Sequence, residues 1–282
     1  MNNSAKKTSI ISIMLILTVG IISGCASNGN SNNEKIEENT TANTLNVDIN
    51  DKNAKALEIS KPEVINETKD SHNLIDTKTK VKNISNFDIR NIQLTFREYD
   101  RDNNALAKTD ALSKITLKPG ESVYIQSAHK KYAKSADVIA YTYGTGDKWV
   151  NVDTLNHKVN ITDIKEKIVK NKKYDILTIS EPKLVNQVDG GYNSQITIKN
   201  LSDKDIGSVV IELAELNGNN EYTNVSYVDS YEVIKKYQEI KLNSVHPNDA
   251  KKLEVIGYIY DDIKDNTTVE VNLKLDEVIL MK

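Results

Sequence analysis

"LEISKPEVIN" (Leu57–Asn66) returns later in the chain as "LTISEPKLVN" (Leu177–Asn186). "TKVKNISNFDIRNIQLTF" (Thr79–Phe96) returns in the same order as "ITIKNLSDKDIGSVVIEL" (Ile196–Leu213). In both places a proline segment leads to an alternating stretch, then Lys-Asn, then Asp-Ile entering a second alternating stretch. Order repeated over about 100 residues indicates two copies of one structural unit. We therefore expect domains over 57–161 and 177–282, joined by a connector over 162–176.

The end of the repeat is ambiguous at the level of sequence. "VIAYTY" in the first copy matches either "VIGYIY" or "TVEVNLKL" in the second. "ITLKPGESVYI" is a weaker match to "IKLNSVHPNDAKKLEVI", and this alignment leaves extra residues around Tyr222–Ile240 in the second copy.

The period of both copies is that of a β-strand. Ile92, Leu94 and Phe96 alternate with polar neighbours, and turn formers such as Pro119-Gly120 and Asp189-Gly190-Gly191 separate such stretches. About seven short strands per copy, without alternating helices, predict an all-β fold of two tandem immunoglobulin-like antiparallel β-sandwiches. The connector "ITDIKEKIVKNKKYD" (Ile161–Asp175) has apolar residues at helical spacing, so we expect a short helix or an interdomain connector there.

The N-terminus has the layout of a secretory signal. Lys6 and Lys7 precede an apolar run from Ile10 to Ile22, which is shorter than the roughly 20 residues of a membrane span. Small residues then lead to the chain's only cysteine, Cys25. Ile22-Ser23-Gly24-Cys25 resembles the lipobox of bacterial lipoproteins. The resemblance implies removal of residues 1–24 by cleavage between Gly24 and Cys25, and lipidation of Cys25 with a diacylglyceryl (palmitate-type) anchor at the extracytoplasmic face of the cell membrane. A plain secretory signal with a chance cysteine, or an uncleaved anchor, remains the alternative.

Residues 25–56 are predicted to form a flexible tether after the lipidated cysteine. They are mostly Asn, Ser, Thr, Glu and Lys, and such a composition buries too little apolar surface to offset its ordering entropy. A coil of this length reaches about 30 Å. Cleavage removes two lysines and no acid, so 35 basic side chains remain against 40 acidic ones, a net charge of −5. That balance argues against a nucleic-acid partner.

One further resemblance rests on "LTFREYDRDNNA" and on the later Pro119-Gly120 turn. A strand with Phe, then Tyr-Asp, a polar turn and a second strand is similar to the FxLYD-type domains of bacterial lipoproteins. The second copy, "IELAELNGNN", keeps the hairpin but lacks Phe, Tyr and Asp. The resemblance implies an extracytoplasmic β-sandwich on the cell surface and no catalytic residues.

The residues that could carry chemistry form no recognised motif. His72, His129, His157 and His246 are expected in or near turns, without an acidic partner at ligand spacing, so we expect no metal site and no cofactor. Asp100, Asp102 and Asn104 begin like a calcium loop, but the positions that require Gly and Glu hold alanines. We expect a polar turn there and a protein that is not an enzyme.

The aromatic residues give the only candidate binding surface. The chain has 13 tyrosines against two phenylalanines and one tryptophan. Tyrosine suits interfaces because it combines a large ring with a polar tip. The alternative is that these rings cap the core. The candidates are Tyr222, Tyr227, Tyr231 and Tyr237 in the second copy, and Tyr141, Tyr143 and Trp149 in the first.

Three functions stay open from the sequence. The first is a membrane-anchored, non-enzymatic lipoprotein that binds or braces a protein or a cell-wall component of the envelope. The second is a structural spacer without a ligand. The third, an enzyme or a solute-binding lipoprotein, has the least support because neither a catalytic motif nor the pattern of large α/β lobes is present.

The lipid anchor leads to a first prediction. Only a thiol can form the thioether to the diacylglyceryl group, so Cys25→Ser should move the protein from the membrane fraction to the soluble fraction. Fractionation of cells followed by immunoblotting measures this, with Ser27→Ala as the control that should stay in the membrane. A Cys25→Ser protein that stays membrane-bound would contradict the lipoprotein assignment.

Overall fold

The computed structural model describes residues 48–67, 74–130, 132–170, 172–188 and 190–281. The predictions for the signal peptide, for Cys25, for most of the tether and for His72 lie outside these residues. The described residues belong to one compact unit, and the two sequence copies form its first and second halves.

The first half consists of two antiparallel sheets. Strand β3 (Leu74–Asn83) pairs with β1, β2 and β6, and β4 (Arg90–Tyr99) lies between β5 and β7 in the other sheet, which continues to β8 and β9. The bounds of the remaining strands are β1 Leu57–Ile59, β2 Glu63–Glu67, β5 Ala105–Ser113, β6 Ser122–Lys130, β7 Ser135–Thr145, β8 Lys148–Asp153 and β9 Lys158–Asp163.

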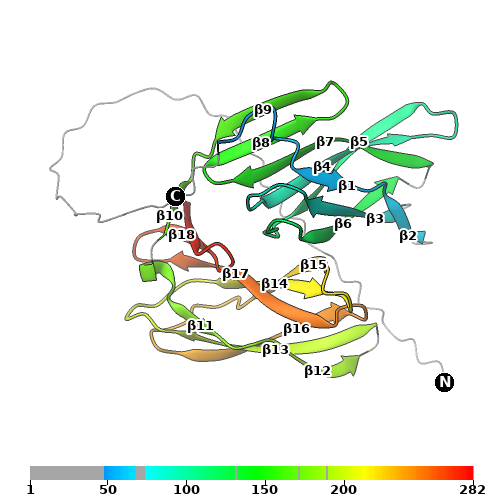
Figure 1. Cartoon of the computed structure of the whole chain (residues 1–282). Helices are drawn as coiled ribbons and strands as arrows, with labels where there is room; N and C mark the ends of the chain where they lie inside the picture. The colour runs from blue at the N-terminus through cyan, green and yellow to red at the C-terminus, as the bar shows by residue number, and fades with distance from the viewer. Residues whose placement is uncertain (1–47, 68–73, 131, 171, 189, 282) are drawn as a thin grey trace, which may run out of the picture. The chain divides into compact units, whose positions relative to one another are not determined.

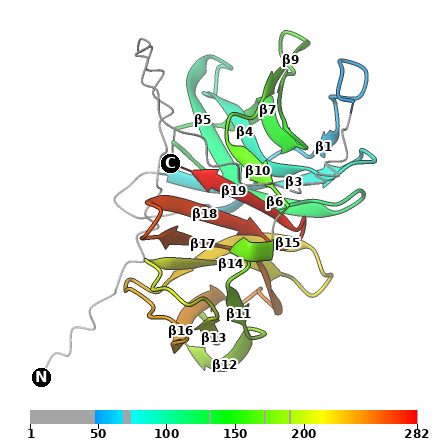
Figure 2. The same cartoon turned by 90° about the vertical axis from the view of Figure 1, so that its left-hand side faces the viewer.

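The second half repeats this order. Strands β11, β12 and β16 pair with β13 in one layer, and β14 lies between β15 and β17 in the other (Figure 1). The second layer continues through β18 and β19 to β10 (Figure 2). The bounds are β10 Lys167–Val169, β11 Leu177–Ile179, β12 Lys183–Val188, β13 Gly191–Asn200, β14 Val209–Leu216, β15 Tyr222–Asp229, β16 Glu239–Pro247, β17 Lys252–Asp262, β18 Thr267–Asn272 and β19 Glu277–Met281.

The alternating pattern of the sequence accounts for the two layers. Along β4 every second residue is buried, and Ile92, Leu94 and Phe96 are fully enclosed while their neighbours are partly exposed. The predicted all-β, antiparallel β-sandwich fold is therefore confirmed. The predicted domain boundaries stay predictions.

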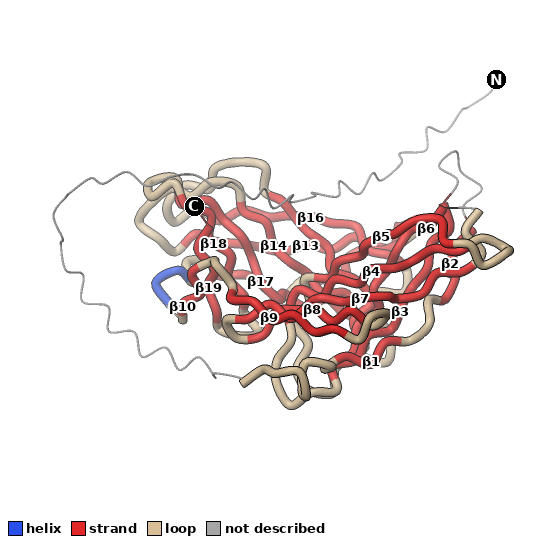
Figure 3. Tube along the Cα trace, turned by 90° about the horizontal axis from the view of Figure 1, so that it is seen from above, coloured by secondary structure: helices blue, strands red, loops and turns tan. Residues whose placement is uncertain are grey.

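The connector differs from the expected helix. Its residues Lys167–Val169 form strand β10, which pairs with β19, and only one 3₁₀ turn follows at Lys172–Tyr174 (Figure 3). Of the two expectations for this segment, a short helix or an interdomain connector, the helix is limited to that 3₁₀ turn, because the apolar residues before it add a strand to the edge of an existing sheet. Tertiary pairing overrides weak local helix propensity in such a segment.

The end of the predicted tether also belongs to the folded part. Ala54 and Ala56 are buried, and the hydroxyl of Tyr143 donates a hydrogen bond of 2.8 Å to the carbonyl oxygen of Ala54. Residues 54–56 therefore pack with the folded part, although the sequence places them at the end of the predicted tether. Two alanines gave no apolar signal in the sequence although both lie against the core.

The structure resolves the alignment of the two copies. Tyr141 and Tyr143 of β7 correspond to Tyr258 and Tyr260 of β17, a spacing of 117 residues that also relates β5 to β15 and β6 to β16. "VIAYTY" therefore matches "VIGYIY". The second copy has no extra residues around 222–240, and "ITLKPG" corresponds to "EVIKKY", so the weak match to "IKLNSV" was wrong.

The same buried asparagine organises a turn in each half. Asn83 Nδ2 donates to the carbonyl oxygens of Phe87 and Leu117 at 2.8 and 3.0 Å, and its Oδ1 accepts from Ser85. Asn200, 117 residues later, donates to Lys204 and Ile234. Each side chain therefore joins two loops through their backbone carbonyl groups, which also accept hydrogen bonds from a backbone amide or a serine hydroxyl.

The halves share buried surface. The larger core cluster lies in the first half and also contains Ala214, Leu216, Tyr222 and Ile256 of the second half, whereas the second core cluster lies within the second half. Strand β15 also meets β6 through one parallel pair, Tyr222 opposite Val123. The outer face of β14, β15 and β17 is thus partly covered by the first half.

We predict that Asn83→Ala and Asn200→Ala each lower the free energy of unfolding by about 2–4 kcal/mol, because each substitution removes the hydrogen bonds that the side-chain amide donates and leaves the backbone amide of Ser85 or Ser202 without its side-chain acceptor. Urea denaturation of the full chain measures the change. Asn86→Ala, at an exposed position of the same turn, should stay within about 0.5 kcal/mol of the parent. Equal values for all three variants would refute the organising role of the buried asparagines.

Candidate functional site

The structure divides the seven candidate aromatic residues. Tyr141, Tyr143 and Tyr222 are buried to 4%, 0% and 6% exposure, and Trp149 is partly buried in β8. The hydroxyl of Tyr222 accepts a hydrogen bond of 2.8 Å from Lys274 Nζ. These rings serve the core or the contact between the halves and are not offered to a partner.

The other three tyrosines are accessible. Tyr227 is 50% exposed, Tyr231 88% and Tyr237 58%. Tyr231 and Tyr237 lie together in the loop of residues 230–238 between β15 and β16, which we call the aromatic loop. Val233 in the same loop is also half exposed.

Hydrogen bonds hold the aromatic loop in a defined shape. The Tyr231 amide donates to Asp229 Oδ1 at 2.6 Å, and the Lys236 amide donates to Asp205 Oδ1 at 2.9 Å. Ile234 is fully buried and forms a backbone bridge with Ile206. The loop is therefore fixed at both ends and at its middle, with Tyr231 and Val233 exposed on it.

Two of the exposed tyrosines have left-handed backbone conformations. The φ angles of Tyr231 and Tyr237 are 55° and 60°. The first-half residue that corresponds to Tyr237 is Gly120, which adopts φ 85° without steric cost. A bulky residue in this region carries backbone strain of about 1–3 kcal/mol, and such strain is concentrated at functional positions.

The loop of the first half that is equivalent to the aromatic loop makes contacts with the second half. Residues 113–121 lie against the second half: Lys114 Nζ is 3.5 Å from Glu212 and 3.8 Å from Glu270. Thr116 Oγ1 accepts from Asn272 at 2.9 Å, and Glu121 pairs with Lys274 at 2.6 Å. One copy of the loop is therefore a docking element, while its equivalent in the second half is exposed.

A buried histidine network was missed by the sequence analysis. His246 Nδ1 lies 2.7 Å from Glu215 Oε1, and its Nε2 lies 2.8 Å from Ser194 Oγ. The first half repeats it with His129 and Glu98. His129 and His246 lie in β6 and β16, so their predicted place in turns was wrong, and His157 alone has a turn conformation among the described histidines. The common spacing of 117 residues between the glutamates and between the histidines was the available signal.

The three side chains are connected as in a Ser–His–Glu catalytic triad, but a substrate cannot reach them. Ser194, His246 and Glu215 are at most 1% exposed, and each lies between the two sheets of the second half. Nucleophilic catalysis requires a substrate carbonyl beside the serine oxygen. The repeated arrangement therefore serves as a hydrogen-bonded polar part of each core.

The other candidate sites are explained by local structure. Asp100 accepts hydrogen bonds from the amides of Asp102 and Asn104 at 2.8 Å each, and these bonds lower the pKa of its carboxyl group. The polar turn expected there is thus present. Within the described residues, no three His, Cys, Asp or Glu side chains gather as a metal site. No helix among the same residues is long and apolar enough to cross a membrane.

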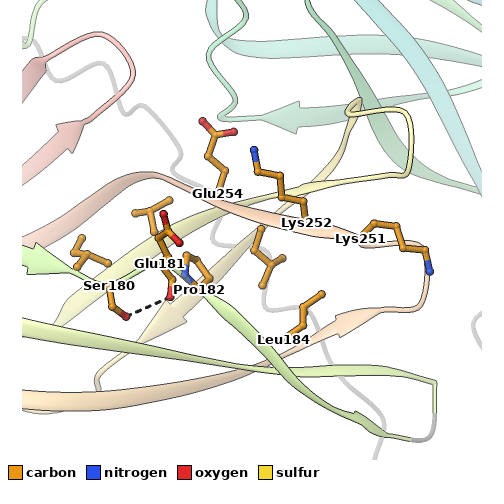
Figure 4. A pocket seen from close by; sticks show the side chains of 10 residues that line it. Ser180, Glu181, Pro182, Leu184, Lys251, Lys252 and Glu254 are labelled. Carbon is orange, nitrogen blue, oxygen red and sulfur yellow. Dashed lines mark hydrogen bonds between the residues drawn. The ribbon is translucent and has the colours of Figure 1, made fainter.

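Each half has a shallow groove at the break in its proline-containing edge strand. In the second half it has a volume of about 600 Å³ and is lined by Ser180, Pro182, Leu184 and β17 (Figure 4). Lys252 and Glu254 rise on one side, and Ser180 Oγ donates to the Glu181 carbonyl oxygen. A similar groove of about 570 Å³ occupies the equivalent place in the first half. No convergent set of polar groups marks either groove as a catalytic site.

The contact between the halves contains a buried carboxyl group, that of Glu212. The pKa of Glu212 is raised to about 7, mainly by burial, while the nearby Lys114 opposes this shift and Glu270 adds to it. Glu212 Oε1 is the oxygen that lies 3.5 Å from Lys114 Nζ. A β-carbon on Gly257 would lie 2.7 Å from the backbone oxygen of Val271 and 2.8 Å from Glu212 Oε2, so glycine is needed there.

Comparisons with known proteins assign no family. No family model matches the chain, and no curated protein matches it. The exo-chitosanase of Amycolatopsis orientalis is 12% identical over 77% of this chain and 26% of its own, with a TM-score of 0.21. Red sea bream transglutaminase is 8% identical over 80% and 31%, with a TM-score of 0.21. The CBM22-1-CBM22-2 tandem domain of Paenibacillus barcinonensis Xyn10C is 8% identical over 80% and 91%, with a TM-score of 0.14. The chain spans about a quarter of the exo-chitosanase and about a third of the transglutaminase. Likenesses at these scores carry no activity over to this chain.

The carboxyl group of Glu212 predicts a pH dependence of stability. Its folded pKa of about 7 exceeds the ordinary 4.5, so the stability linked to its protonation is present below pH 4.5 and is lost as the pH rises to about 7. The loss amounts to about 3 kcal/mol at most. Glu212→Gln should flatten this part of the profile, measured by urea unfolding from pH 4 to pH 8. Glu232→Gln, at an exposed position, should keep the parent's slope, and an unchanged slope in Glu212→Gln would refute the assignment.

Proposed function

We propose that this chain is a lipid-anchored, extracytoplasmic, non-enzymatic protein that binds a protein partner through the aromatic loop of its second half. The lipobox-like end at Cys25 supports the anchor and the location. The aromatic loop supports the binding role, and the tether would allow the folded part to reach a partner away from the membrane.

One observation carries the proposal. The loop of residues 113–121 in the first half docks against a β-sheet, and the equivalent aromatic loop is held just as firmly but is exposed. Interfaces are enriched in tyrosine around a rigid centre, because a tyrosine ring loses little conformational entropy on contact. Tyr231 and Tyr237 provide such rings at a position whose equivalent is a docking element.

The alternatives are supported less well. A spacer without a partner needs no exposed tyrosines in left-handed conformations, since asparagine or glycine would adopt them at a lower cost. An enzyme needs an accessible acid, base or nucleophile, and the triad-like network is enclosed between sheets. A solute receptor needs an enclosed ligand pocket, whereas the two grooves are open and shallow.

In-cell photo-crosslinking tests the binding role. A photoreactive phenylalanine analogue in place of Tyr231 should form a covalent adduct with a partner, because the ring at this position would contact it. Mass spectrometry of the purified adduct identifies what was captured. The same analogue in place of Tyr143, which is fully buried, is the matched control and should give no adduct.

Adducts at Tyr231 that vanish when Val233 is changed to Asp would support binding by the aromatic loop. The absence of any adduct at Tyr231, Val233 and Tyr237 would contradict the proposal and favour a spacer.

A further inference from the structure

We infer that the aromatic loop of one molecule docks on the outer face of the sheet β5-β4-β7-β8-β9 in the first half of a second copy of this chain. This inference rests on the proposed function and names the partner of the same loop. The proposed contact between two molecules would have the same arrangement as the contact between the two halves of one molecule.

The contact within the chain has two different sides. One side is the loop of residues 113–121 with neighbouring residues of β3 and β6, and the other is the outer face of β14, β15, β17 and β18. Each side has an equivalent elsewhere in the chain. The equivalent of the first side is the aromatic loop with β13 and β16, and the equivalent of the second is the outer face of β4, β5, β7 and β8.

Both equivalents are accessible and carry apolar residues. Leu112 of β5 is 57% exposed and Leu155, just after β8, is 49% exposed, so the first-half sheet face is uncovered. Tyr231 and Val233 are exposed on the other equivalent. One molecule therefore has a free docking loop at one end of the repeat and a free receiving face at the other.

Strand pairing gives the residue-by-residue correspondence. Equivalent residues of the loops, and of β4 and β5 with their second-half counterparts, are 117 residues apart in sequence. The pair Thr95–Asp110 between β4 and β5, for example, is equivalent to the pair Glu212–Tyr227 between β14 and β15. In β8 the spacing is 119 residues, because Tyr141 pairs with Val152 as Tyr258 pairs with Val271.

Where the internal contact has an ion pair, the equivalent positions of the proposed contact have uncharged residues on both sides. Lys114, which meets Glu212 and Glu270, corresponds to Tyr231, and the two glutamates correspond to Thr95 and Asn151. A change on one side alone would leave an unpaired charge at the contact. The matched change keeps the two surfaces compatible.

Two further ion pairs follow the same rule. Lys80 and Glu221, 2.5 Å apart, correspond to Thr197 and Asn104. Glu121 and Lys274, 2.6 Å apart, correspond to Gln238 and Leu155.

One pair breaks the rule. Arg90 and Glu277 form an ion pair, and their equivalents are Gly207 and Lys158, so one charge is left unpaired there. None of these equivalent contacts sets two like charges against each other.

The symmetry of this contact predicts its product. The two sides are different surfaces, so the contact is heterologous and each added molecule presents a new free loop. Such a contact leads to chains of molecules that do not stop at a dimer. On a membrane, tethered molecules would form rows.

Cysteine crosslinking of the full chain in its own membranes tests the inference. The double variant Tyr231→Cys with Asn151→Cys places a thiol on each side of the proposed contact, and both positions are exposed in the folded chain. The parent has no cysteine other than Cys25. A short bismaleimide should give a ladder of dimers, trimers and larger species in the double variant, and the ladder should be lost in either single variant.

A matched control verifies that the reagent spans this contact. Lys114→Cys with Glu270→Cys places thiols at the equivalent internal positions, 3.8 Å apart at the side-chain tips of the native pair. This variant should be crosslinked within one chain and should remain a monomer on a denaturing gel.

A charge test adds a second, independent readout. Val233 corresponds to Thr116, and Asp153 to Asn272, the residue that donates to Thr116. Adding Val233→Asp to the double variant should abolish the ladder by setting a carboxylate against Asp153. Adding Val233→Lys should preserve the ladder because opposite charges would meet.

Several outcomes would overturn the inference. A dimer in the Tyr231→Cys single variant would show a symmetric contact between two aromatic loops. A double variant that remains monomeric while the internal control reacts would exclude self-docking. If photo-crosslinking at Tyr231 then captures a different protein, the proposed binding function survives and this inference fails; if it captures nothing, both fail.

Discussion

The contact of Lys114 with Glu212 and Glu270 lies at the centre of this structure. It sets the loop of residues 113–121 against the outer face of the second half, where the larger core cluster also takes in Leu216 and Ile256. Because that contact uses one loop and one sheet face, it leaves the equivalent loop and the equivalent face without a covering element. The exposed tyrosines, the candidate site and the proposed self-docking all follow from this asymmetry between two similar halves.

Each half also contains buried polar side chains that are hydrogen-bonded within its core. The two histidine–glutamate networks and the two buried asparagines occur at the same spacing of 117 residues. A buried polar group is costly unless it is hydrogen-bonded, and satisfied networks specify one arrangement of the core. Glu212 lies instead at the contact between the halves, with Oε1 3.5 Å from Lys114 Nζ, and burial raises the pKa of its carboxyl group, so this contact is sensitive to pH.

Sequence reasoning identified the fold class because strand alternation and turn chemistry are local signals. Ile92, Leu94 and Phe96 alternate in the sequence as they do in β4. It also pointed to Tyr231 and Tyr237, which are exposed, but it could not separate them from Tyr141, Tyr143 and Tyr222, which are buried. Residue type alone does not determine whether a tyrosine is buried, because burial depends on which sheet covers the side chain. The strand in the connector could not be predicted for the same reason, since pairing with β19 is a contact over more than 100 residues of sequence.

The sequence by itself determined an all-β chain made of two related copies, because the alternation of apolar residues and the repeat can both be recognised in the linear sequence. Its lipobox-like cysteine is a similar local signal and predicts an anchor. Only the tertiary structure decided that the copies share buried surface, that two histidines are enclosed with glutamates, and that one of two equivalent loops is covered while the other is free. These properties depend on which distant segments meet, and that is set by the sum of packing and charge contacts between them rather than by any short stretch of the chain.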